Sequence, residues 1–107
     1  MNKITYSKDD LIKKLSSKIL FSHDDMKFMV DNFFETILEI LQQPHDIIRI
    51  EIRNFGIFEV KPTKAKPKAR NPKTNEIIYV PPHKKISFKP GKILKDELRK
   101  EWKGNIE

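Results

Sequence analysis

The sequence predicts an α+β fold, because helical periodicity near both ends encloses a central region with strand-like alternation. Apolar residues recur at helical spacing over residues 7–20, 23–42 and 91–102. Residues 46–61 instead alternate apolar with charged side chains, and residues 61–87 are rich in Lys and Pro. The predicted order is therefore helix, helix, hairpin, long arm and short helix.

The first helix is expected to begin at Ser7, because Asp10 follows three residues later, as the second residue of a capping box does. Asp9 and Asp10 lie in the first turn, where the helix dipole favours negative charge. One apolar stripe identifies the face to be buried, and it consists of Leu11, Ile12, Leu15 and Ile19.

The second helix is expected to begin after Ser22 and to end before Pro44. Its main apolar face comprises Met26, Met29, Val30, Phe33, Ile37, Ile40 and Leu41. Phe28, Phe34 and Leu38 widen this face beyond what one short helix covers. A helix that is apolar on most sides is buried on most sides, so the sequence predicts an obligate dimer.

The hairpin is expected over residues 46–61, where Ile48, Ile50 and Ile52 alternate with charged residues. Asn54-Phe55-Gly56 gives the turn, and Phe58 and Val60 should share the buried face of the return strand.

The arm, about residues 61–87, is expected to be a projecting hairpin that stays mobile without a ligand. Its first half has no large apolar residue, and residues 71–75 form a strong turn. Prolines within it cannot donate ladder hydrogen bonds, which restricts the arm to exposed or irregular pairing.

The charge of the chain is concentrated in one segment. The 107 residues carry 22 Lys and Arg against 15 Asp and Glu, a net charge of +7. Residues 61–95 hold 11 of the basic residues and one acid, Glu76, while the remainder of the chain is slightly acidic. A single basic domain over residues 1–107 with a polyanionic partner is the prediction.

Most catalytic chemistry is excluded by composition. There is no Cys, and three Gly are too few for a phosphate-binding loop. His23, His45 and His83 lie in different predicted elements without metal-ligand spacing. We therefore expect no enzyme activity, no metal, no cofactor and no small-molecule substrate. Neither a secretory signal nor a membrane span is expected.

Pro72 is expected at the tip of the arm, between Arg70 and Lys73. A rigid ring without a donor, flanked by cations, suits a wedge between base steps in the minor groove. The alternatives are that Pro72 only forms the turn and that the arm is a disordered, solubilising lysine tract.

Three motifs resemble the bacterial HU and integration host factor family of DNA-binding proteins. They are Asn54-Phe55-Gly56-Ile57-Phe58-Glu59-Val60, Arg70-Asn71-Pro72-Lys73-Thr74 and Phe88-Lys89-Pro90-Gly91-Lys92-Ile93-Leu94-Lys95-Asp96. Together they extend the resemblance over about residues 7–100. Asn54 and Asn75 stand where the family usually has Gly, and Asn tolerates the left-handed conformation needed there. Trp102 lies beyond the motifs and is expected to pack on the last helix.

The resemblance implies an intertwined dimer with a helical body, a β-sheet saddle and two long β-ribbon arms around duplex DNA. It places Pro72 as the intercalating wedge and implies that the amide of Gly91 meets a phosphate. Phe55, Phe58 and Phe88 match core positions beneath the saddle. The expected DNA-binding residues are Pro72, Arg70, Asn71, Lys73, Lys61, Lys64, Lys66, Lys68, Lys84, Lys85, Lys89, Gly91, Lys92, Lys95 and Lys8.

The function expected is that of a histone-like architectural protein that bends duplex DNA largely independently of sequence. It would contribute to nucleoid compaction in the cytoplasm, as a homodimer or as a heterodimer with a paralogue. A site-specific bender resembling integration host factor is the alternative. A scaffold that grips an acidic protein and a nuclease are the rivals from other classes.

Overall fold

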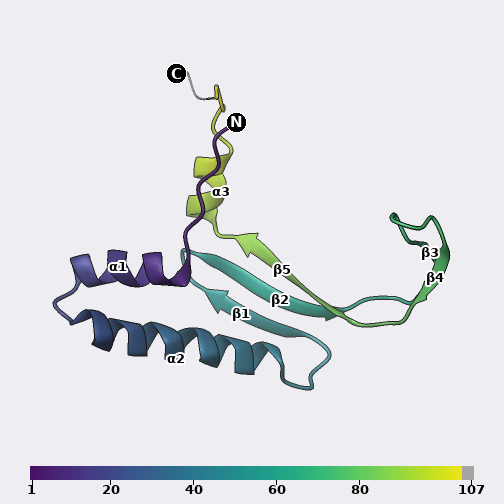
Figure 1. Cartoon of the computed structure of the whole chain (residues 1–107), viewed down its shortest axis with the longest axis horizontal. Coiled ribbons are helices and arrows are strands. Elements are labelled where there is room, and N and C mark those ends of the chain that lie inside the picture. The colour runs from purple at the N-terminus through teal and green to yellow at the C-terminus, as the bar shows by residue number, and fades with distance from the viewer. Residues whose placement is uncertain (105–107) are drawn as a thin grey trace. The chain divides into compact units, whose positions relative to one another are not determined.

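The computed structural model describes residues 1–104, so residues 105–107 of the predicted domain lie outside the described part. Its contacts divide the chain into two compact units, Met1–Gln42 together with the residues from Glu101 onward, and Gln43–Lys100. The described residues form three helices and five strands (Figure 1), which confirms the α+β class. That residues 1–107 make one domain stays a prediction.

The first unit contains α1 (Lys8–Lys18) and α2 (His23–Leu41), both beginning where the sequence predicts. Ser7 and Asp10 form the predicted capping box, with the Asp10 amide 3.2 Å from the Ser7 hydroxyl and the Ser7 amide 2.9 Å from the Asp10 carboxylate. The Ser22 hydroxyl likewise accepts from the amide of Asp25. Both caps satisfy amides that a helix leaves without an intrahelical partner.

The core between α1 and α2 is small. Within the first unit, Ile12, Met26 and Val30 are buried, and Leu15 packs against them. Most of the remaining apolar face of α2 is open, with Phe28 70% and Leu38 57% exposed. Packing between the two helices therefore leaves exposed most of the apolar face of α2, the face from which we predict a dimer.

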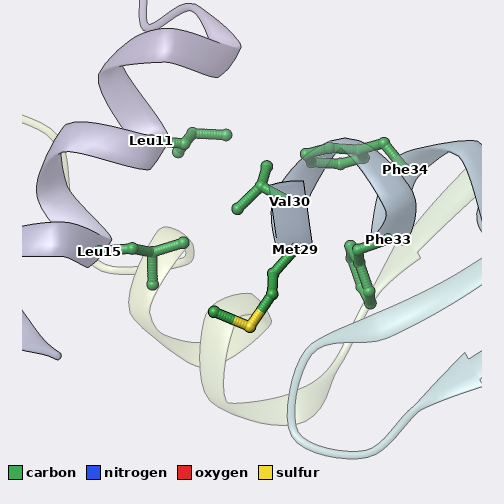
Figure 2. Close-up of a pocket in the computed structure, with 6 residues that line it drawn as sticks. All are labelled: Leu11, Leu15, Met29, Val30, Phe33 and Phe34. Carbon is green, nitrogen blue, oxygen red and sulfur yellow. The ribbon is translucent and has the colours of Figure 1, made fainter. Parts of the chain in front are cut away.

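Part of this open surface is an apolar groove between α1 and α2. Figure 2 shows Leu11 and Leu15 of α1 on one side and the side chains of α2 on the other. The lining from α2 comprises Met29, Val30, Phe33 and Phe34. Phe33 and Phe34 pack edge to face, with ring centroids 5.6 Å apart, so the groove wall is ordered within one chain.

The second unit is built on two antiparallel sheets. The strand order is β1-β2-β5 in the larger sheet, and β3 pairs with β4 in the smaller one. The strands are β1 (Ile48–Ile52), β2 (Gly56–Pro62), β3 (Lys66–Arg70), β4 (Ile77–Val80) and β5 (Lys84–Pro90).

The register of the larger sheet places its apolar residues on one face. Ile50 pairs with Phe58, and Phe58 pairs with Phe88, so the alternation predicted for this hairpin is confirmed. Ile48 and Val60 are the buried hydrophobic residues of this face. Phe55 and Phe88 pack together but are still 48% and 39% exposed. The expected core under the saddle is thus incomplete in a single chain.

The turn residues behave as predicted, because Asn54 has φ 66° and Asn75 has φ 61°. Strands β2 and β5 can approach closely at Gly56 because this residue has no side chain. A Cβ atom there would lie 2.5 Å from the Lys89 carbonyl oxygen.

The last helix, α3, spans Lys92–Leu98, so the expectation of a helix over residues 91–102 was wrong at its C-terminal end. Trp102 lies outside the helix and is 79% exposed, which corrects its expected packing role. Leu98 and Trp102 are both largely exposed, so burial of their side chains does not stabilise a further helical turn.

The protein is expected to sediment as a folded dimer at micromolar concentration. Met29→Lys or Phe33→Lys should abolish assembly and folding together, because dimerisation would bury an unpaired ammonium group. Glu35→Lys on an exposed part of α2 is the matched control and should leave the dimer intact. A folded 12.7 kDa monomer at this concentration would contradict the prediction.

Candidate nucleic-acid interface

The arm begins later and ends earlier than residues 61–87. Lys61 pairs with Lys85, and Pro62 pairs with Lys84, within the β2–β5 ladder. Lys61, Lys84 and Lys85 therefore belong to the body sheet, which corrects their expected place in the arm. Beyond this ladder, β3 and β4 form a separate two-stranded ribbon (Figure 1).

The ribbon carries three of its cations on β3 and two beside it. Ala69 pairs with Ile78, and Arg70 pairs with Ile77, with an irregularity between Lys66 and Ala69. The basic side chains are exposed, as expected for a segment that cannot form a core. These exposed cations between Thr63 and His83 are Lys64, Lys66, Lys68, Arg70 and Lys73.

The tip is a hydrogen-bonded turn that presents Pro72 to solvent. The Asn71 side-chain oxygen accepts from the amide of Lys73 at 2.9 Å, and the Asn71 carbonyl accepts from the amide of Asn75 at 2.7 Å. The Arg70 guanidinium donates to the Asn75 side-chain oxygen at 2.9 Å. Asn71 thus shapes the turn through its side chain, and the Pro72 ring projects from an ordered support.

The base of the ribbon is held by Thr63 and His83, which no sequence pattern links as a pair. The Thr63 amide donates to the His83 carbonyl at 2.7 Å, and the Thr63 hydroxyl accepts from the His83 amide at 3.2 Å. These bonds extend the β2–β5 ladder past the proline at position 62. No local signal predicts them, because the two residues are twenty positions apart.

A buried carboxylate lies among the cations of the body sheet. Glu59 is 6% exposed, and Lys61 Nζ lies 3.0 Å and Lys89 Nζ 3.9 Å from its Oε1. Arg49 Nε lies 3.5 Å from Oε2. The Lys61 ammonium, more than the other two cations, holds the pKa of Glu59 below its usual range, although burial opposes this. Lys61 and Lys89, both expected to contact phosphates, therefore share the Glu59 carboxylate as a counterion within the fold.

The start of α3 presents Lys92 and Lys95, three positions apart and hence on one helix face. Both side chains are exposed. The amide of Gly91 donates to the Phe55 carbonyl at 2.8 Å. This bond corrects the expectation that the Gly91 amide is available to a phosphate. A side chain at Gly91 would also press on the Phe55 backbone, so the glycine serves close packing.

Lys8 lies in the first unit and makes an ion pair across the two helices. Its ammonium lies 2.6 Å from Oδ1 of Asp31, and Lys27 lies 2.6 Å from Oδ2. Both lysines lower the pKa of Asp31, Lys27 more strongly. Lys8 therefore stabilises the α1–α2 pair, and any contact with DNA would compete with this ion pair.

Among residues 1–104, no group of three or more acidic or imidazole side chains is arranged to hold a metal ion. No helix in the same part of the chain has the length and apolarity to cross a membrane.

A hydrogen-bonded basic ribbon with a proline tip, on a small sheet followed by a helix that presents lysines, defines a nucleic-acid-binding protein of the arm-bearing kind. Residues 6–99 match the family described as Bacterial DNA-binding protein. The chain belongs to this family, which includes HU and integration host factor, as its motifs predict.

Individual relatives agree with this assignment. Integration host factor subunit alpha of Haemophilus influenzae is 35% identical over 96 residues, covering 90% of this chain and 96% of that protein. DNA-binding protein HU 1 of Bacillus subtilis is 40% identical over 92 residues, covering 86% and 96%. A solved HU–DNA cocrystal structure from Anabaena has a TM-score of 0.75 at 25% identity, covering 90% of this chain and 100% of that one.

The family consists of DNA-binding proteins and not of enzymes, which confirms the predicted class of function. Integration host factor subunit alpha is by its name one subunit of an assembly, in agreement with the open apolar face of α2.

Glu59→Gln should lower the free energy of unfolding at neutral pH. Because the folded-state pKa lies below the unfolded value, the carboxylate stabilises the fold above the usual glutamate range. This contribution is lost as the pH falls from about 4 through the folded-state pKa. Urea denaturation at fixed protein concentration over a pH series measures both effects.

The matched control is Glu76→Gln, which removes an exposed carboxylate that has no ion pair among residues 1–104. It should leave the pH dependence of stability unchanged. Identical acid profiles for Glu59→Gln and the parent would show that the three cations do not stabilise the fold through this carboxylate.

Proposed function

We propose that this protein is an architectural DNA-binding protein that binds and bends duplex DNA largely independently of sequence. The observation that carries the proposal is the hydrogen-bonded tip of the ribbon, with Arg70 and Lys73 on either side of an exposed Pro72. Membership of a family whose solved relative was crystallised with DNA supports the same function. No cofactor or small-molecule substrate enters this function.

Affinity arises from phosphate neutralisation. The arm lysines, with Lys92 and Lys95 of α3, have no acidic partner among the described residues, so their ammonium groups can replace condensed counterions on DNA. Lys61, Lys84, Lys85 and Lys89 contribute from the body sheet. Lys61 and Lys89 do so less per residue, because each must leave or share Glu59.

Bending arises at the tip. The Pro72 ring inserts between base steps from the minor groove and holds a kink open, while Arg70 and Lys73 follow the groove. The cost of unstacking is a few kcal/mol per step and is offset when bent DNA reaches more of the basic surface. Flexible, nicked or already distorted duplexes should therefore be preferred.

A site-specific bender is the second candidate, because integration host factor subunits are among the relatives. Phosphate contacts carry no base information, and the cations named here are of that kind, which favours the sequence-independent function. A footprint on mixed-sequence DNA separates the two, since a site-specific protein protects one position.

The biological role that follows is nucleoid compaction by a histone-like protein in the cytoplasm. The partner chain is a second copy of this protein, with a paralogue as the alternative. Native mass spectrometry of the protein purified from its own cells distinguishes the homodimer from the heterodimer.

Binding should weaken on the order of a hundredfold or more between about 50 and 200 mM salt, if several cations per dimer meet phosphates. Lys92→Ala or Lys95→Ala should lower affinity to a similar degree on every sequence and reduce the salt slope. Fluorescence anisotropy with duplexes of different sequence measures this. An affinity that does not change with salt would contradict the assignment of these lysines.

Pro72→Ala should reduce DNA bending markedly and reduce affinity much less, because it keeps the charge of the arm and removes most of the wedge. Energy transfer between the ends of a short duplex measures the bend. Arg70→Ala is the converse variant and should weaken binding more than it changes the bend of the DNA that is bound. If Pro72→Ala bends DNA as strongly as the parent, Pro72 acts only as a turn former.

A further inference from the structure

Strand β4 is apolar along its whole length, although it lies in a ribbon that has no core. Ile77 is 63% exposed, Ile78 41% and Tyr79 61%, and Val80 completes the strand. The cations of the ribbon are on β3, just before it and at the tip, and β4 has none. The ribbon therefore pairs a basic strand with an apolar one.

The register sorts these apolar residues onto two faces. Ile77 pairs directly with Arg70, so both side chains project from the same face. Ile78 lies on the opposite face, paired with Ala69. Tyr79 is two residues beyond Ile77 on β4 and shares its face by strand alternation, because the irregularity between Lys66 and Ala69 lies on β3. The two more exposed apolar side chains thus accompany the arginine beside Pro72.

We propose that Ile77 and Tyr79 form an apolar strip that packs against the deoxyribose walls of the DNA minor groove. This inference rests on the proposed function, which it deepens by naming an uncharged component of arm binding. Sugar C–H groups line the groove between the two phosphate rims, so a ribbon with one basic and one apolar strand matches both surfaces.

Charge on the same face identifies the occupant as DNA. Arg70 stands beside Ile77, and the one acid between Thr63 and His83 is Glu76. A second copy of the arm would bring like charges together, which disfavours contact between two ribbons. Pro81 and Pro82 directly follow β4 and lack the amides for edge pairing with another ribbon.

The chemistry of Tyr79 suits the boundary between groove and solvent. A tyrosine buries an apolar ring while its hydroxyl stays hydrated or bonds to a polar group at the rim. The strip releases no counterions, so its contribution to affinity is independent of salt. The arm would then retain part of its affinity for DNA at ionic strengths that weaken the contacts between lysines and phosphates.

The test measures the affinity of the full-length dimer for a linear duplex of mixed sequence over a salt series. Tyr79→Ala should weaken binding on the order of tenfold, as expected when an aromatic ring is no longer buried, with an unchanged slope of log K against log salt. Lys68→Ala should reduce that slope by about 0.9 for each phosphate that the lysine neutralises. Tyr79→Lys should bind with a steeper slope than the parent.

Ile78→Ala is the matched control, because it removes an apolar side chain of the same strand from the other face. It should leave the affinity within about twofold of the parent, whereas Ile77→Ala should weaken binding several-fold with no change of slope. Equal losses for Ile78→Ala and Ile77→Ala would overturn the assignment of the face. Thermal denaturation of each variant checks that the body of the protein is unaffected.

The outcomes separate this inference from the function on which it rests. If the parent fails to bind duplex DNA, the proposed function is wrong. If the parent binds and Tyr79→Ala binds equally well, the apolar strip alone is wrong. If Tyr79→Ala instead lowers the association state of the DNA-free protein in sedimentation, the strip contacts another arm and the inference is overturned.

Discussion

The apolar face of α2 is the constraint on which the rest of the structure depends. Two helices that bury Ile12, Met26 and Val30 between them cannot stabilise a domain, because the free energy of burying so few side chains is far below the entropy of ordering the chain. The groove beside Phe33 and Phe34 leaves apolar side chains exposed in a single chain, and we expect dimerisation to cover it. Each chain has one β3–β4 ribbon, so a dimer that forms for stability also has two arms.

Ion pairs divide the cations of this protein into two groups. Asp31 and Glu59 each bind more than one cation, which commits Lys8, Lys27 and Lys61 to contacts within the chain. The ribbon, by contrast, has almost no acid, and its lysines have no acidic partner among residues 1–104. The free charge is therefore concentrated on a segment without a core. Such a segment can adapt to DNA without loss of folded-state packing.

Local patterns accounted for most of the elements and for the exposed part of the interface. Ser7 and Asp10 gave the first helix start, the Ile and Phe alternation gave the sheet face, and the turn at Pro72 gave the tip. Asn54 and Asn75 adopt the left-handed conformation inferred from their replacement of glycine. These features succeed because each depends on residues a few positions apart, within reach of capping, turn and alternation rules.

Sequence alone was sufficient to determine the fold class, the wide apolar face that predicts a partner chain and the central position of the basic arm, since these follow from periodicity and charge. Only the tertiary structure decided which cations are already paired, because Glu59 meets Lys89 through strand register and not through sequence proximity. It also decided that Gly91 donates its amide to Phe55, that α3 ends at Leu98 and that Ile77 and Tyr79 share a face with Arg70. Contacts between distant residues depend on how strands and turns meet in space, and no local pattern encodes that meeting.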